Sequence, residues 1–154
     1  MSSTPGATAH QALQLITGLY RTTNAVVREL DQRLGQDHNV TFIQAITLLA
    51  VDSFTRAQPH LVADYLSQQS QTVTGVLDRL ERAGHLTRQR DLDDRRAVRL
   101  ELTPSGKTVV DAVRATLERH LGDIVSGVDG ETRARLTKDL EILELSVRTA
   151  ARNG

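Results

Sequence analysis

The sequence predicts a mainly helical protein with one small β-hairpin. The second arm of the hairpin is marked by alternation, because Val98, Leu100 and Leu102 are apolar whereas Arg99 and Glu101 between them are charged. This is the period of a half-buried strand. Most other apolar residues recur instead at helical spacing. With 154 residues, the chain is long enough to bury the core of one domain of ordinary size.

A charged loop joins the two arms of the hairpin. Residues 91–96 contain three acids, two arginines and a single apolar residue, Leu92, so we expect the loop to project into solvent or onto a partner. Directly after the second arm, Thr103 and Pro104 match a helix N-cap followed by proline at the first helical position. The hairpin should therefore lead straight into a new helix.

Two helices are expected near the start of the chain. Residues 1–7 are small and polar, which predicts a disordered tail. From residue 8 the apolar pattern predicts a long helix that Gly35 could end in a left-handed cap. Thr41 and Gln44 then match a capping box, which predicts that a second helix begins there.

Two further helices, over about 61–66 and 71–83, are separated by a short polar turn. Gly84 would end the second of them. Its inner face would consist of Val73, Val76, Leu77 and Leu80. This arrangement is typical of a helix-turn-helix, whose second helix enters the major groove of DNA. Polar residues on a helix face are also often merely solvated. The residues expected to meet bases or phosphates are Ser70, Gln71, Thr72, Thr74 and Arg79, although Arg79 could instead pair with a neighbouring side chain.

Together with the hairpin as a wing, residues 41–103 are predicted to form a winged helix-turn-helix that binds DNA. The helix after Thr103 and a last helix that begins near Asp129 carry long apolar stripes, as does the first helix. A two-fold interface between two copies would bury these stripes, which predicts a helical dimerisation region over 8–40 and 104–151. An intrachain bundle is the alternative.

Composition narrows the functional classes. The net charge is zero, with 19 basic and 19 acidic side chains, but residues 68–107 hold eight basic groups against six acids. The absence of cysteine excludes disulfides and thiolate metal sites. Without a signal sequence or a membrane-length apolar run, we expect a cytoplasmic protein with no membrane partner. No phosphate loop, nucleophile elbow or metal-binding helix motif is present, so we expect no enzyme, catalytic residue, metal or cofactor.

The run from Val62 to Lys107 resembles the multiple antibiotic resistance regulator (MarR) family of bacterial transcription factors. The resemblance is carried by separate elements in order: Val62-Ala63 with Leu66, Val73-Thr74, the run from Leu77 to Glu81, Gly84, Asp94-Arg95-Arg96, and Leu102-Thr103 with Gly106. It implies a homodimer with interlocked terminal helices, whose two winged lobes bind a pseudo-palindromic operator in double-stranded DNA. The resemblance also favours a repressor, because repression is the usual role of members of this family.

The resemblance also implies roles in the wing. Arg96 would enter the minor groove, held extended by Asp94. Arg88, Arg90 and Arg95 would hold phosphates or pair with nearby acids. Alternatively, the charged residues at the tip merely keep the hairpin soluble.

Many members of the family respond to small aromatic or lipophilic ligands, so a small-molecule effector is expected as a further partner. The main alternative function is a winged-helix module that binds protein without sequence-specific DNA binding, which the zero net charge would suit. The dependence of affinity on salt concentration distinguishes DNA binding from protein binding, because phosphate binding weakens steeply with ionic strength.

Overall fold

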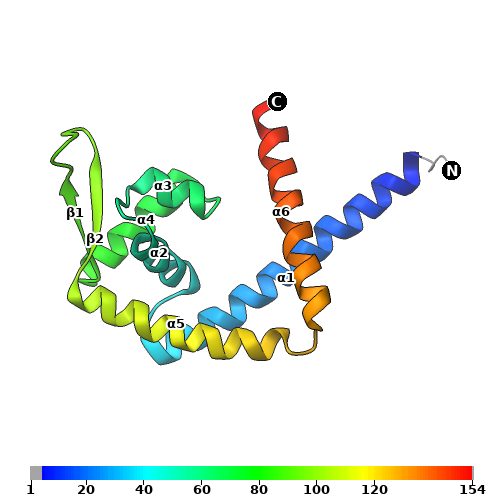
Figure 1. The fold of residues 1–154 in the computed structure, drawn as a ribbon, viewed down its shortest axis with the longest axis horizontal. Helices are drawn as coiled ribbons and strands as arrows, with labels where there is room; N and C mark the ends of the chain where they lie inside the picture. Colours follow the sequence, from blue (N-terminus) through cyan, green and yellow to red (C-terminus); the bar gives the residue numbers. More distant parts are fainter. Residues whose placement is uncertain (1–4, 154) are drawn as a thin grey trace. The chain divides into compact units, whose positions relative to one another are not determined.

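The computed structural model describes residues 5–153. The chain forms two compact units, one up to Arg114 and one from Ala115 onward. The prediction of a mainly helical fold with one antiparallel hairpin is confirmed. The elements, in chain order, are α1 (Pro5–His38), α2 (Phe42–Ser53), α3 (Pro59–Tyr65), α4 (Ser70–Arg82), β1 (Leu86–Arg90), β2 (Val98–Leu102), α5 (Pro104–Val125) and α6 (Gly130–Asn153) (Figure 1).

Helix α1 is longer than expected at both ends. It begins at Pro5, so part of the expected disordered tail is helical, while residues 1–4 lie outside the described residues. It also continues past Gly35, and the left-handed residue after the helix is Asn39, with a φ of 55°. The prediction that Gly35 ends the helix is therefore wrong. Leu34 and Val40 are both buried, and their burial offsets the modest cost of a glycine inside a helix. Asn39 tolerates the left-handed conformation because its side chain is short and polar.

The start of α2 is formed by the predicted capping box. The Thr41 hydroxyl accepts the backbone N–H of Gln44 at 3.3 Å, and the Gln44 side-chain oxygen accepts that of Thr41 at 2.9 Å. A carboxylate oxygen of Asp31 in α1 accepts the N–H of Phe42 at 2.6 Å. These bonds satisfy N–H groups that would otherwise lack partners at the helix N-terminus.

The core of the first unit lies under α4. The predicted inner face of this helix is fully buried, and residues from α2, α3 and both strands pack with it. Each fully buried leucine or valine contributes about 1.5–3 kcal/mol of transfer free energy. Helix α4 begins one residue earlier than expected, and Gly84, with a φ of +80°, follows its end as predicted. The core residues of α4 are Val73, Val76, Leu77 and Leu80.

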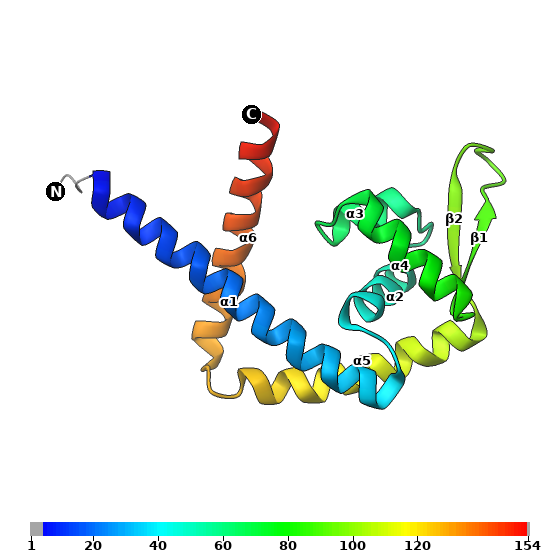
Figure 2. The ribbon, with the colours of Figure 1, turned by 180° about the vertical axis from the view of Figure 1, so that it is seen from behind.

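The two strands of the hairpin pair in antiparallel register, with Leu86 opposite Leu102 and Arg90 opposite Val98. Leu100 is buried, but Val98 is 38% exposed and Leu102 is only partly covered, like the charged Arg99 and Glu101, so the predicted alternation holds at the centre of β2 and not along its whole length. The N–H of Leu100 also donates to the carbonyl of Ala57 at 2.9 Å, so the connection between α2 and α3 runs along β2. The hairpin stands beside α4 with its loop at the free end (Figure 2).

Helix α5 begins as the sequence predicts. The Thr103 hydroxyl oxygen accepts the N–H of Gly106 at 3.0 Å, and its O–H donates to the carbonyl of Gly84 at 2.6 Å. One side chain thus caps α5 and ties it to the end of α4.

In the second unit, Asp129 caps α6 by accepting the N–H of Thr132 at 2.9 Å. These bonds with the N–H and the hydroxyl of Thr132 lower the pKa of the Asp129 carboxyl. Many apolar side chains of this unit are exposed: Leu121, Ile124, Leu136, Leu140, Ile142, Leu145 and Val147. Over residues 5–153, none of the helices has the combination of length and apolarity that a bilayer span requires.

Candidate nucleic-acid interface

The outer face of α4 is polar and open. Ser70, Gln71, Thr72, Thr74 and Arg79 are all exposed, opposite the buried face of the same helix. The Thr74 hydroxyl donates to the carbonyl of Ser70 at 2.9 Å. Within the described part of the chain, the side chains of Gln71 and Thr72 make no hydrogen bond, so their polar atoms are available to a partner.

Arg79 extends this face by one helical turn. Its guanidinium lies beside Gly75, where an added Cβ would be 3.9 Å from Nη2. Among residues 5–153 no carboxylate lies within ion-pair distance of Arg79. Of the two roles that the sequence left open, pairing with a neighbour is therefore not the one found in the structure. The absence of a side chain at Gly75 leaves the guanidinium room against the helix.

In the wing, the loop is organised around Asp91. This residue is buried, and its carboxylate accepts the N–H groups of Asp93 at 2.9 Å and of Asp94 at 3.3 Å. The N–H of Asp93 is the main cause of a lowered pKa for Asp91; the N–H of Asp94 and the charges of Arg56 and Arg99 act in the same direction, against burial. A carboxylate held by two N–H groups favours its charged form, so Asp91 orders the loop as an anion.

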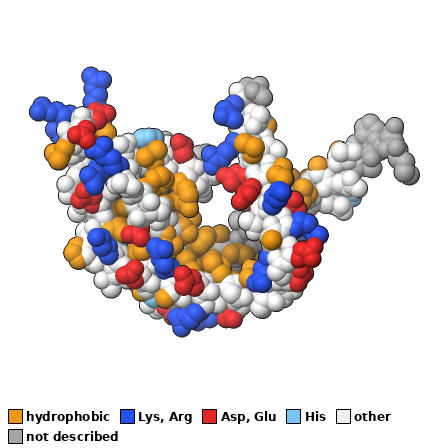
Figure 3. Space-filling model, in the orientation of Figure 1, with side chains coloured by type: hydrophobic (Ala, Val, Ile, Leu, Met, Phe, Trp, Pro, Cys, Tyr) orange, Lys and Arg blue, Asp and Glu red, His pale blue; other side chains and the backbone are white. Residues whose placement is uncertain are grey.

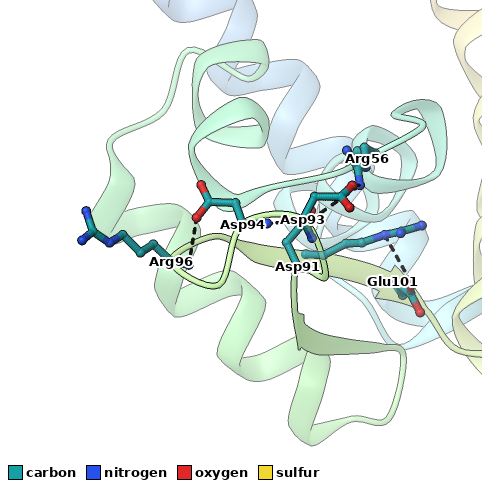
Figure 4. A network of polar contacts seen from close by, with 7 residues as sticks. Arg56, Asp91, Asp93, Asp94, Arg96 and Glu101 are labelled. Atoms are coloured by element: carbon teal, nitrogen blue, oxygen red, sulfur yellow. Dashed lines mark hydrogen bonds and ion pairs between the residues drawn. The ribbon is translucent and has the colours of Figure 1, made fainter.

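The other two acids of the loop are also engaged. Asp93 forms an ion pair with Arg56 from the connection between α2 and α3. A carboxylate oxygen of Asp94 accepts the backbone N–H of Arg96 at 3.0 Å. Asp94 therefore restrains the backbone of Arg96. The sequence led us to expect that Asp94 would hold the Arg96 side chain extended, but its bond is to the Arg96 backbone instead. The Arg96 side chain points away from the loop (Figure 4).

As a result, the arginines at the tip are available. Arg95 and Arg96 are exposed, and in the described structure neither is within ion-pair distance of a carboxylate. Arg90, at the end of β1, is also exposed, and no carboxylate of the described residues lies within ion-pair distance of it. Basic side chains protrude at the end of the hairpin (Figure 3). The tip of the wing thus presents guanidinium groups to a partner although the loop contains more acids than bases.

Arg88 differs from the other arginines of the wing. Its guanidinium pairs with Asp78 at 2.7 Å and with Glu81 at 2.5 Å, and its side chain is only 25% exposed. Both acids lie on α4, so Arg88 fastens β1 to the helix. Of its two expected roles, phosphate contact or structural pairing, the structure supports the second.

Arg56 was not expected from the sequence. It lies outside every motif of the chain. It pairs with Asp91 at 3.6 Å and with Asp93, which is 37 positions away in the sequence. Only the pairing of the α2–α3 connection with β2 brings it to the wing. Among the described residues, no cluster of three or more histidines or acids is placed to hold a metal ion.

Comparisons with known proteins agree with this geometry. Residues 38–97, from the end of α1 to the wing, match the model of the MarR family. The HTH-type transcriptional repressor NicR of Pseudomonas putida is 29% identical over 132 residues, which cover 82% of this chain and 80% of the relative.

Two solved structures have the same fold. The transcriptional regulator BldR of Sulfolobus solfataricus is 25% identical, with a TM-score of 0.78 over 87% of this chain and 95% of its own. BpsR of Bordetella bronchiseptica, whose DNA binding is regulated by 6-hydroxynicotinic acid, is 23% identical, with a TM-score of 0.75 over 84% of this chain and 92% of its own. Proteins of this group are transcriptional regulators rather than enzymes. The chain is thus similar to transcriptional regulators of the MarR family, in sequence over residues 38–97 and in fold over most of its length.

Proposed function

We propose that this protein is a sequence-specific DNA-binding repressor that binds a pseudo-palindromic operator as a homodimer. The observation that carries the proposal is the pairing of two open surfaces in the first unit, the polar face of α4 and the tip of the wing. The guanidinium groups on both surfaces lack ion pairs within the described residues. Unpaired arginines can contact phosphates without first losing a partner in the protein.

Each surface has a role in this proposal. Helix α4 enters the major groove, where its short side chains permit close approach and Gln71 meets base edges. Arg79, Arg90 and Arg95 hold phosphates. Arg96 enters the adjacent minor groove, because a narrow minor groove concentrates negative potential and attracts guanidinium groups. Exchange of Gln71 should then alter which half-site is preferred, not only the affinity.

The homodimer is supported by apolar surface on the terminal helices. Large apolar side chains of α1 are exposed, among them Leu13 and Ile16, and those of α6 are exposed as well. A monomer in water seldom leaves apolar patches of this kind uncovered. We assign dimerisation to residues 8–40 and 104–151, and the operator to two half-sites whose centres lie about one helical turn of DNA, roughly 34 Å, apart.

A small aromatic or lipophilic effector completes the proposal. The support comes from BpsR, whose DNA binding is regulated by 6-hydroxynicotinic acid. Titration of small aromatic acids into a preformed complex with the operator should release DNA with at least one of them. An effector that binds the DNA-free conformer more tightly shifts the population away from DNA by that difference in affinity.

The first test is selection from a random pool of DNA duplexes at physiological salt. Enrichment of an inverted repeat is the expected result. On the selected site, three phosphate-binding arginines in each protomer predict a slope of log K against log salt of about −5. Failure to enrich any sequence, or an affinity that is independent of salt, would contradict the proposal and favour a winged-helix module that binds protein.

A further inference from the structure

We propose that Arg56 is a positioning residue that braces the wing and leaves its two tip arginines free for DNA. The inference rests on the proposed function and deepens it. Arg56 lies in the connection between α2 and α3, outside both the helix-turn-helix face and the hairpin. In this proposal Arg56 does not contact DNA and acts instead through two acids of the wing loop, Asp91 and Asp93.

The wing is held at two neighbouring points by this connection. The first is the backbone bond from the N–H of Leu100 to the carbonyl of Ala57, at 2.9 Å. The second is the guanidinium of Arg56, which reaches Asp93 and lies 3.6 Å from the Asp91 carboxylate (Figure 4). The first point holds the middle of β2, and the second holds the loop. A hairpin fixed at both is restrained from pivoting about its base.

The electrostatic consequence concerns Asp93. Three acids and two arginines give residues 91–96 a formal charge of −1. Asp91 and Asp94 are held by backbone N–H groups of the loop itself, whereas the Asp93 carboxylate is 73% exposed and its bond in the structure is to Arg56. Without Arg56, this carboxylate would be free to pair with Arg95 or Arg96, or to repel a phosphate. Arg56 therefore removes an intramolecular competitor of DNA.

A direct phosphate contact is the alternative role for Arg56, because its side chain is 52% exposed. The two roles predict different behaviour of Asp93. If Arg56 itself bound phosphate, removal of the nearby negative charge at Asp93 would leave DNA binding unchanged or strengthen it. If Arg56 acts through Asp93, neutralising Asp93 weakens binding although the wing becomes less negative.

The experiment compares Arg56→Ala, Asp93→Asn and the double variant with the control Arg114→Ala. Arg114 is matched to Arg56, since it is an arginine of the same unit, is also 52% exposed and pairs with one aspartate, Asp52, at 3.0 Å. Because Arg114 lies within residues 104–151, to which dimerisation is assigned above, it is the control for thermal midpoints and exchange rates and not for operator affinity. Thermal midpoints of all four variants should stay near that of the wild type. Asp93→Asn breaks the same contact from the wing side, so the test does not depend on one variant.

The first readout needs no DNA. Amide hydrogen exchange of the free protein should be about fivefold faster at the wing amides Asp93, Asp94 and Ala97 in Arg56→Ala, because local opening becomes easier. Arg114→Ala should leave these rates unchanged. Unchanged rates in Arg56→Ala would overturn the brace whatever the affinity for DNA.

The second readout is affinity for the selected operator. We expect about a tenfold loss in Arg56→Ala and a smaller loss, about threefold, in Asp93→Asn. The double variant should bind about as Asp93→Asn does and tighter than Arg56→Ala, because it lacks the Asp93 carboxylate that competes for the tip arginines, so the two effects are not additive. Additive effects, or tighter binding by Asp93→Asn, would overturn the proposal. If the wild type itself binds no duplex, the proposed function fails, and the exchange rates still decide whether Arg56 braces the wing.

Discussion

The carbonyl oxygen of His85 lies 1.8 Å from the point where a Cβ on Gly106 would stand. The same oxygen accepts the N–H of Thr103 at 3.1 Å, so it is held in place. The first turn of α5 thus packs backbone against backbone on the residue that precedes β1. Only glycine allows this approach, and the junction determines how the wing is connected to α5.

Gly106→Ala should destabilise the protein by about 1–3 kcal/mol, as expected for a side chain forced into filled space. Gly35→Ala is the control, because nothing lies within 4 Å of a Cβ at that helical position. It should be neutral or stabilise by up to about 1 kcal/mol. Thermal unfolding followed by circular dichroism measures both. Equal midpoints for the two variants would contradict the account of this junction.

Arg88 and Arg90 lie on the same strand and should behave differently. Arg88→Ala leaves Asp78 and Glu81 without their partner, so stability should fall by about 1 kcal/mol while the salt dependence of operator binding stays the same. Arg90→Ala should leave stability unchanged and reduce the salt slope by about 1 for each site lost. Denaturant unfolding and binding at several salt concentrations separate these outcomes. The reverse pattern would assign Arg88 to the DNA.

Arg96→Ala should weaken operator binding by about 1–3 kcal/mol without changing the oligomeric state. The reason is that the Arg96 side chain leaves the loop unpaired, while its backbone N–H remains bonded to Asp94 in the variant. Fluorescence anisotropy with the selected operator gives the affinity, and sedimentation gives the oligomeric state. Wild-type affinity in this variant would contradict the role of the wing in DNA binding.

A charge on the apolar face of α6 should prevent dimerisation. Leu140 is 48% exposed, and Leu140→Arg would place a guanidinium in the proposed apolar interface between two protomers, where a charge is costly to bury. Glu141→Arg adds the same side chain at an exposed position away from the stripe of Leu136, Leu140 and Val147. Light scattering after gel filtration should find monomers only for Leu140→Arg. A dimeric Leu140→Arg protein would place the interface elsewhere.

The order of the wing should be independent of pH in the physiological range. The folded pKa of Asp91 is lowered, chiefly by the N–H of Asp93, so its stabilising effect is complete above the unfolded pKa of about 3.9. It is lost only as the pH falls through the lower folded value. NMR shifts of the Asp93 and Asp94 amides should therefore titrate with a midpoint below about 3.9. A midpoint near neutrality would show that Asp91 is not held as described.

Several elements could be predicted because their signals lie within a few residues of one another. The capping box needs only Thr41 and Gln44, three positions apart, and the cap of α5 needs only Thr103 and the residues after it. The inner face of α4 follows from its apolar spacing alone. At the end of α1, by contrast, the glycine signal at Gly35 failed, because burial of Leu34 and Val40 outweighs a local preference.

The sequence by itself determined the order of elements, the polar outer face of α4 and the presence of a charged wing. Which charges in the wing are free was decided by the tertiary structure. Arg88 is bound to α4, and Asp93 is bound to a residue 37 positions away. Ion pairs depend on distances in space, and these follow from how the α2–α3 connection and α4 pack against the hairpin. Local patterns in the chain carry no record of those distances.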